Sequence, residues 1–120
     1  QGRVDEAEDT FHAIDGSSAS VGTRITLAAT EGLLHFRRGR VVEGRTRYLD
    51  AADWARRESH EYARLLALAY LAREELTANT AKASETLKVL LEVQGLEERY
   101  PDIALVVERL RQTAQAEKAL

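Results

Sequence analysis

Hydrophobic residues recur along this chain every three or four positions, the spacing that places them on one face of an α-helix. One face of the first segment carries Val4, Ala7, Phe11 and Ile14. Similar stripes predict further helices over residues 20–38, 41–58, 60–75 and 81–94, and a last helix that begins at Pro101. No segment alternates between polar and apolar residues over the length of a strand. The pattern therefore predicts an all-α chain of about six helices.

Short stretches of turn-forming residues separate these helices. They are Gly16-Ser17-Ser18, Gly39, Thr77-Ala78-Asn79-Thr80 and Gly95. Glycine commonly ends a helix, and Ser, Thr and Asn cap helix ends. Because connections this short make neighbouring helices antiparallel, we expect a row of helical hairpins.

The helices also repeat one another. At a shift of 37 residues, one set of positions matches another: Gly2, Ala7, Phe11 and Ile14 with Gly39, Gly44, Tyr48 and Ala51. At a shift of 35 residues, a second pair of sets matches: Ala28, Gly32 and His35 with Ala63, Ala67 and Tyr70. Self-similarity at such a period is typical of stacked hairpins, in which small residues let two helices approach and a ring fills the space beside them.

This pattern resembles the tetratricopeptide repeat, whose unit pairs two antiparallel helices over ~34 residues. The family's spacing is kept by Gly32, His35, Gly39, Gly44, Tyr48 and Ala51, with His35 in place of the usual aromatic ring. The next unit keeps Ala67 and Tyr70, but Glu74 replaces the turn glycine and no proline closes a unit. The alternative is an unrelated helical bundle whose small residues fall in register by chance.

The resemblance implies one domain over residues 1–120, folded as a short right-handed solenoid. Its parts are the second helix of a partial repeat (1–15), two repeats (20–58 and 60–94) and a capping helix (101–119). Since the chain has no methionine, we expect it to be a piece of a longer protein.

The register of the repeat also predicts a concave partner-binding groove. One face of the second helix carries Thr26, Ala29, Leu33, Phe36 and Arg37, and the matching face of the fourth carries Arg64, Leu68 and Leu71. These positions are not needed for packing within a hairpin, and exposed apolar patches often mark binding surfaces. The alternative is that another helix, such as the last one, covers them.

The residues that carry chemistry are scattered. The chain has no cysteine, and its three histidines (His12, His35 and His60) have no ligand partner at metal-binding spacing. His60-Glu61 begins like a zinc-protease signature, but Arg64 stands where the second histidine is needed. Neither a phosphate-binding glycine loop nor a nucleophile motif is present. We therefore expect no cofactor, no metal and no enzyme activity.

Charge gives one further candidate site. The segment Arg37–Arg47 carries Arg37, Arg38, Arg40, Arg45 and Arg47, which could bind an anionic partner or could simply be solvated. The acidic pair Glu74/Glu75 is interpreted as a solvated helix face. A formal net charge of −3 makes nucleic acid an improbable partner. The longest apolar stretch, Leu65–Ala72, is too short to cross a bilayer, so we expect a cytoplasmic protein without a membrane segment.

These observations favour a non-catalytic module that binds a protein or peptide segment in its groove, as part of a larger regulatory or assembly protein. One alternative is self-association, because Val4, Phe11 and Ile14 lack the helix that would cover them. The other is a nucleic-acid-binding accessory domain that uses the Arg37–Arg47 cluster. The chaperone-binding version of the repeat, which clamps a carboxylate with asparagines and lysines, is disfavoured because Asn79 is the only asparagine.

Overall fold

The computed structural model describes residues 21–119, and within that range it contains helices and no strand. In chain order the helices are α2 (Val21–Arg37), α3 (Val41–Arg57), α4 (Glu61–Thr77), α5 (Lys82–Leu91), α6 (Leu96–Arg99) and α7 (Pro101–Ala119). The prediction of an all-α fold is confirmed for this part of the chain. The helix predicted over residues 1–15 lies outside the described residues.

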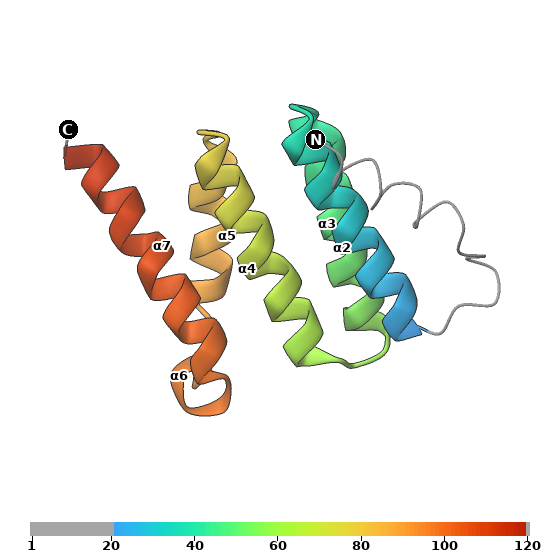
Figure 1. Cartoon of the computed structure of the whole chain (residues 1–120). Helices are drawn as coiled ribbons and strands as arrows, with labels where there is room; N and C mark the ends of the chain where they lie inside the picture. The colour runs from blue at the N-terminus through green and yellow to red at the C-terminus, as the bar shows by residue number, and fades with distance from the viewer. Residues whose placement is uncertain (1–20, 120) are drawn as a thin grey trace.

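The helices form two layers (Figure 1). Helices α2, α4 and α7 lie in one layer, and α3 and α5 lie behind them. Helix α3 packs against both α2 and α4, while α5 packs against α4 and α7. Helix α4 is therefore the centre of the molecule, which explains why it is apolar on several sides and buries Leu65, Ala69, Leu71 and Ala72 completely.

The turns after α2, α3 and α4 repeat with a period of 20 residues. Each of these helices is 17 residues long, and each is followed by a residue with a left-handed backbone: Gly39 (φ 76°), Ser59 (φ 56°) and Asn79 (φ 59°). Each turn contains a backbone hydrogen bond between residues five positions apart. These bonds are Arg40 N–H to His35 O (2.8 Å), His60 N–H to Ala55 O (2.8 Å) and Thr80 N–H to Glu75 O (3.0 Å). This is the Schellman arrangement that ends helices. The two hairpins consequently begin 40 residues apart, at Val21 and Glu61, and the last helix begins a further 40 residues on, at Pro101.

The α2–α3 hairpin is held at very short range by two glycines. A Cβ atom on Gly32 would lie 2.8 Å from ring carbon Cδ2 of Tyr48 and 3.0 Å from the carbonyl oxygen of Gly44. A Cβ atom on Gly44 would lie 2.6 Å from ring carbon Cδ2 of Phe36. The two glycines therefore let the backbones meet, and the two rings fill the space beside them. Ala51, further along α3, is completely buried.

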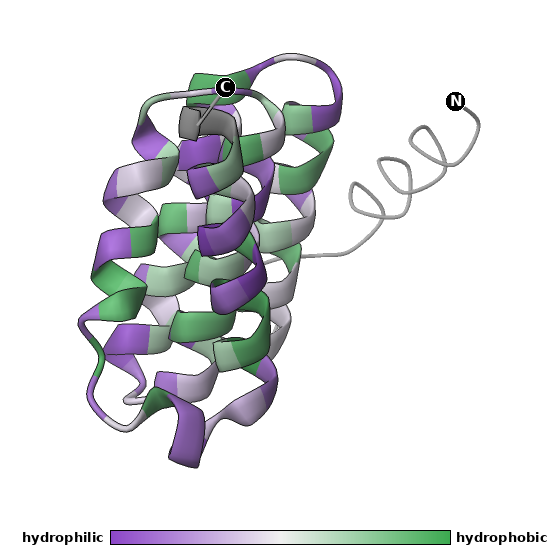
Figure 2. Ribbon diagram, turned by 90° about the vertical axis from the view of Figure 1, so that its left-hand side faces the viewer, coloured by the Kyte–Doolittle hydropathy of each residue, from purple (hydrophilic) through white to green (hydrophobic). Residues whose placement is uncertain are grey.

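The second hairpin departs from the sequence-based prediction. Helix α5 ends at Leu91, earlier than expected, and a turn with Gly95 (φ 69°) leads into the short helix α6. Helix α6 was not predicted, because four residues are too few for a hydrophobic period. The last helix begins at Pro101, where the sequence placed it. This side of the molecule faces the viewer in Figure 2, where hydrophobic and hydrophilic stretches alternate along the helices.

The left-handed residue at position 59 gives a prediction about stability. Serine pays a steric penalty in this conformation and glycine does not, so Ser59→Gly should raise the free energy of unfolding by about 0.5 kcal/mol. The matched control is Ser84→Gly in α5, which should lower it by about 0.5 kcal/mol, since glycine disfavours a helix. Urea unfolding followed by circular dichroism measures both changes. Equal effects of the two substitutions would contradict the role of Ser59.

Candidate functional site

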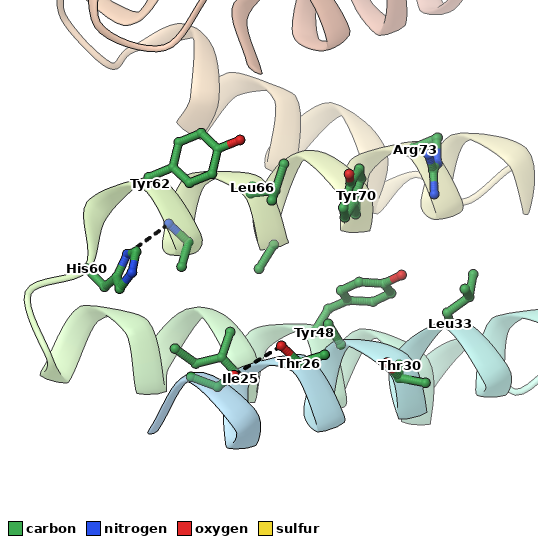
Figure 3. A pocket seen from close by; sticks show the side chains of 14 residues that line it. Ile25, Thr26, Thr30, Leu33, Tyr48, His60, Tyr62, Leu66, Tyr70 and Arg73 are labelled. Atoms are coloured by element: carbon green, nitrogen blue, oxygen red, sulfur yellow. Dashed lines mark hydrogen bonds between the residues drawn. The ribbon is translucent and has the colours of Figure 1, made fainter. Parts of the chain in front are cut away.

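An apolar groove of about 600 Å³ lies between α2 and α4 (Figure 3). One wall comes from α2, with Gly22, Ile25, Thr26, Ala29, Thr30 and Leu33. The other wall comes from α4, with Tyr62, Ala63, Leu66, Ala67, Tyr70 and Arg73. Tyr48 of α3 also lines the groove, and His60 lies at one end. The groove exists because α3, packed against both helices, joins α2 to α4 while leaving their facing sides largely apart.

The α2 wall includes three of the predicted groove residues, namely Thr26, Ala29 and Leu33. Phe36, also predicted there, is 9% exposed, because its ring packs against Gly44 in the hairpin. Arg37 is exposed and lies beside Glu74. Of the five α2 positions, three therefore line this groove, and the two at the C-terminal end do not.

The α4 wall differs from the predicted one by a rotation of the helix. Leu68 and Leu71 are 8% and 0% exposed, because they pack into the protein core. Arg64 lines a separate small hollow with Ser59 and His60. The groove is instead formed by Ala63, Leu66 and Tyr70, among others. The alternative that other helices cover the predicted residues therefore holds for Leu68 and Leu71. Leu68 belongs to a core cluster that includes Ile103 and Val107 of α7, although α7 contributes no residue to the groove lining.

Tyr48 of α3 lines the groove between the two walls, and its side chain is only 2% exposed. Its ring centroid lies 6.1 Å from that of Phe36. Burial, together with the nearby negative charge of Glu74, raises the pKa of Tyr48 to about 12. The hydroxyl therefore stays protonated at neutral pH. Of the predicted signature residues, Tyr48, Ala67 and Tyr70 line the groove, whereas Gly32, Gly44 and Ala51 pack within the structure.

One end of the groove carries positive charge. The guanidinium carbon of Arg73 lies 4.8 Å from the ring centroid of Tyr70, in a cation–π arrangement. Its Nε donates a hydrogen bond to Glu74 Oε2 (3.3 Å), and Arg37 Nη2 lies 3.5 Å from the same oxygen. Two exposed arginines thus share one buried carboxylate, which leaves this end of the groove with an excess positive charge.

The opposite end is held in place by tyrosines. The Tyr62 hydroxyl donates a hydrogen bond to Asp102 Oδ2 (2.5 Å), and its ring centroid lies 5.3 Å from that of Tyr100. This hydrogen bond lowers the pKa of Asp102 and raises the pKa of Tyr62. His60 caps α4, because its Nδ1 accepts a hydrogen bond from the Ala63 amide (3.4 Å). These contacts connect the start of α4 to the start of α7.

The side chains of Glu74 and Glu75 are both buried. The interpretation of this pair as a solvated helix face was therefore wrong. Glu75 is completely buried and forms an ion pair with Arg45. The Thr86 hydroxyl donates a second hydrogen bond to Glu75 Oε1 (2.6 Å). This cluster joins α3, α4 and α5. A buried carboxylate is stable only when it is paired and hydrogen-bonded in this way.

The arginine cluster contributes to these internal contacts. Arg45 binds Glu75, and Arg47 Nε lies 3.4 Å from Glu31 Oε2. Arg40 Nε donates a hydrogen bond to His35 Nδ1 (2.8 Å), which places the imidazole at the α2–α3 turn rather than in the groove. Because several of its guanidinium groups have acidic or imidazole partners, the cluster lends no support to the nucleic-acid alternative, which stays a prediction.

Comparisons with known protein families, with curated proteins and with solved structures found no match to this chain. The resemblance to the tetratricopeptide repeat therefore stays a prediction. Among residues 21–119, no group of three or more His, Asp or Glu side chains is arranged to hold a metal ion. None of the helices in this part of the chain has the length and apolar character needed to cross a membrane.

Several groove residues were not predicted from the sequence, chiefly Tyr62, Leu66 and Arg73. The matched positions Ala63, Ala67 and Tyr70 could have indicated them, because Leu66, Tyr70 and Arg73 lie three or four residues apart and so share one face of a helix. That face was assigned to packing within the hairpin instead of to the groove.

The raised pKa of Tyr48 gives a prediction about alkaline stability. The unfolded chain ionises this tyrosine near its ordinary pKa of 10.0, whereas the folded protein holds the proton to about 12. The stabilising effect is therefore complete below pH 10 and is lost as the pH rises towards 12, by about 2 kcal/mol. Tyr48→Phe should remove this part of the loss when urea unfolding is compared between the two pH values.

The matched control is Tyr70→Phe, which removes another hydroxyl of the groove but keeps Tyr48. It should lose stability in alkali as the unaltered protein does. An alkaline loss that is equally steep in Tyr48→Phe and in the unaltered protein would contradict the assigned role of burial at Tyr48.

Proposed function

We propose that this chain is a non-catalytic interaction module that binds an apolar segment of a partner protein in the groove between α2 and α4. The observation that carries the proposal is the groove itself, which is concave, has mainly apolar walls and has a volume of about 600 Å³. This volume lies within the range of binding cavities, which are typically apolar with a few polar groups that set the orientation of the ligand. Here Arg73 at one end and the tyrosine hydroxyls are the groups suited to that task.

The arrangement of ionisable groups supports a binding role over a catalytic one. His60 and Arg73, the lining residues most suited to acid–base or anion chemistry, lie at opposite ends of the groove (Figure 3). General acid–base catalysis needs such groups within hydrogen-bonding reach of one reacting centre. His60 is moreover used as the cap of α4.

The solenoid interpretation belongs to the same proposal. Antiparallel helices in two layers, with a glycine contact at Gly32 and Gly44 and rings beside it, are what the tetratricopeptide spacing predicts. The hairpins here begin 40 residues apart, which is longer than the ~34 residues of that family. We therefore propose a tetratricopeptide-like solenoid with lengthened helices, placed in the cytoplasm as part of a larger protein.

Thr26 allows a direct test of the groove. It is exposed on the α2 wall, and its hydroxyl only bonds back to the Gly22 carbonyl (3.0 Å). Thr26→Glu would add a carboxylate and extra volume to the groove without disturbing the core. Peptides selected from a phage-displayed random library should be apolar with acidic residues, and the substitution should weaken their binding by about tenfold or more. Fluorescence anisotropy measures the affinity.

Thr46→Glu is the matched control. Thr46 is exposed on α3, outside the groove, and its hydroxyl bonds back to Val42 in the same way (3.0 Å). Peptide affinity should be unchanged in this variant. If no peptide is enriched, or if both substitutions have equal effects, the groove is not the binding site.

Self-association is the second candidate, and a different surface favours it. Leu91 and Leu105 are 51% and 53% exposed and line a hollow of about 650 Å³ between α5 and α7. Leu105→Glu would place a charge in this hollow and should weaken a homodimer by about tenfold or more. Sedimentation velocity measures the change, with Leu49→Glu on the exposed side of α3 as the control. A protein that is monomeric at all concentrations would rule this candidate out.

A further inference from the structure

We propose that the α2–α4 groove also binds a dissolved amphiphile that has one carboxylate head and one alkyl chain of medium length. Its carboxylate lies at Arg73 and its chain lies between the two walls. This ligand goes beyond the proposed partner segment and adds regulation to it, because a ligand that fills the groove excludes the partner. The proposal depends on the groove and not on the existence of the partner.

Several polar groups of the groove are already engaged inside the protein. The Thr26 hydroxyl bonds to the Gly22 carbonyl (3.0 Å), and the Tyr62 hydroxyl donates to Asp102 Oδ2 (2.5 Å). An extended peptide would bring an N–H and a C=O group at every residue, and each costs free energy when it is buried without a partner. A partner segment must satisfy these groups internally, as a helix does, whereas an alkyl chain has none to satisfy.

The length of the apolar walls matches an alkyl chain of medium length. The α2 wall extends from Gly22 to Leu33 and the α4 wall from Tyr62 to Arg73, and each spans ~16 Å along its helix. Three bonds of an extended chain span about 3.5 Å, so a chain of roughly ten to twelve carbons fills most of this length. The groove volume of about 600 Å³ lies in the range that is typical of sites for small molecules.

The charge at one end selects the head group. The groove lining contains Arg73 and no carboxylate. Glu74 is buried and interacts with both Arg73 and Arg37, which are exposed, so this cluster has one positive charge in excess. The Tyr70 ring, 4.8 Å from the guanidinium carbon, holds Arg73 in place. Since Nε of Arg73 donates to Glu74, its Nη groups are the donors suited to a ligand carboxylate.

The arrangement in Figure 3 gives the direction of the ligand. Arg73 and Leu33 stand at one end of the groove, and Ile25 and His60 stand towards the other. With its carboxylate at Arg73, the chain passes Leu33 first and runs between the walls towards Ile25. The ligand therefore places its only charged group at the end that has the excess positive charge.

Two probes with the same chain and opposite charges test the head group. Decanoate and decyltrimethylammonium are titrated as dissolved monomers into the full-length chain, and calorimetry measures their affinities. Decanoate should bind about tenfold more tightly or better, because its charge complements that of Arg73. Octanoate should bind about threefold more weakly than decanoate or worse, because each buried methylene group adds hydrophobic free energy.

Arg73→Glu should reverse the preference between the two probes, because the excess of one positive charge becomes an excess of one negative charge. The matched control is Arg57→Glu, which changes the net charge equally. Arg57 also pairs with a carboxylate, Asp53 Oδ2 (2.9 Å), and also lies near an aromatic ring, that of Trp54 (5.6 Å). Because Arg57 lies outside the groove, this variant should keep the preference for decanoate.

Thr26→Glu keeps the test decisive if Arg73→Glu unfolds, as judged by circular dichroism. This substitution adds a carboxylate to the groove lining and leaves the cluster around Glu74 unchanged. It should weaken the binding of decanoate several-fold, because the added charge repels the head group and shortens the apolar wall.

Equal affinities for the two probes would overturn the inference, and so would an unchanged preference in both groove variants. Binding to phosphatidylglycerol vesicles without binding to dissolved decanoate would also overturn it, because the ligand would then be a membrane surface. Decanoate should displace the peptides selected for the groove, and binding without displacement would place the ligand elsewhere. Peptide binding without decanoate binding rejects this inference and leaves the proposed function intact. Decanoate binding without any enriched peptide keeps the ligand and rejects the partner.

Discussion

The backbone contact between Gly32 and Gly44 is the constraint from which the rest of the described structure follows. It brings α2 and α3 together at a distance that no other residue pair would allow, because a Cβ atom on either glycine would collide with a ring or a carbonyl oxygen. The rings of Phe36 and Tyr48 fill the space on each side of the contact. This contact fixes Tyr48 of α3 where it lines the groove between α2 and α4. The packing inside the α2–α3 hairpin therefore shapes the groove that this hairpin forms with α4.

The two buried glutamates of α4 complete this arrangement. Adjacent residues on a helix point about 100° apart, so Glu74 and Glu75 reach different neighbours. Glu74 interacts with Arg37 and Arg73 beside the groove, whereas Glu75 interacts with Arg45 on the other side. Carboxylates near the C-terminal end of a helix are unfavourable, because that end already carries partial negative charge. The arginines offset both this effect and the burial, which explains why an apparently free basic cluster follows α2.

The sequence was sufficient to predict the helices of the described part of the chain and most residues of the α2 wall of the groove, but not those of the α4 wall. On α2, Gly32 identifies the side that must face α3, and Thr26, Ala29 and Leu33, which lie about 60–120° around the helix from Gly32, line the groove. Helix α4 has no glycine and is apolar on several sides, because it packs against α3, α5 and α7. A hydrophobic period cannot distinguish Leu68, which is buried, from Leu66, which lines the groove. Buried ion pairs such as that of Glu75 leave no local pattern at all.

The shape of the groove follows from the sizes of the side chains that line its two walls. Small residues on both walls, such as Ala29 and Ala63, leave room between the larger lining side chains, and His60 and Arg73 stand at opposite ends (Figure 3). A ligand with a bulky apolar side chain can therefore insert between the walls, and it gains hydrophobic free energy there whichever way it runs. Its direction depends on the polar groups at the ends, because Arg73 stands at one end of the lining and His60 at the other. Apolar burial thus provides affinity in this groove, and the asymmetry of charge provides orientation.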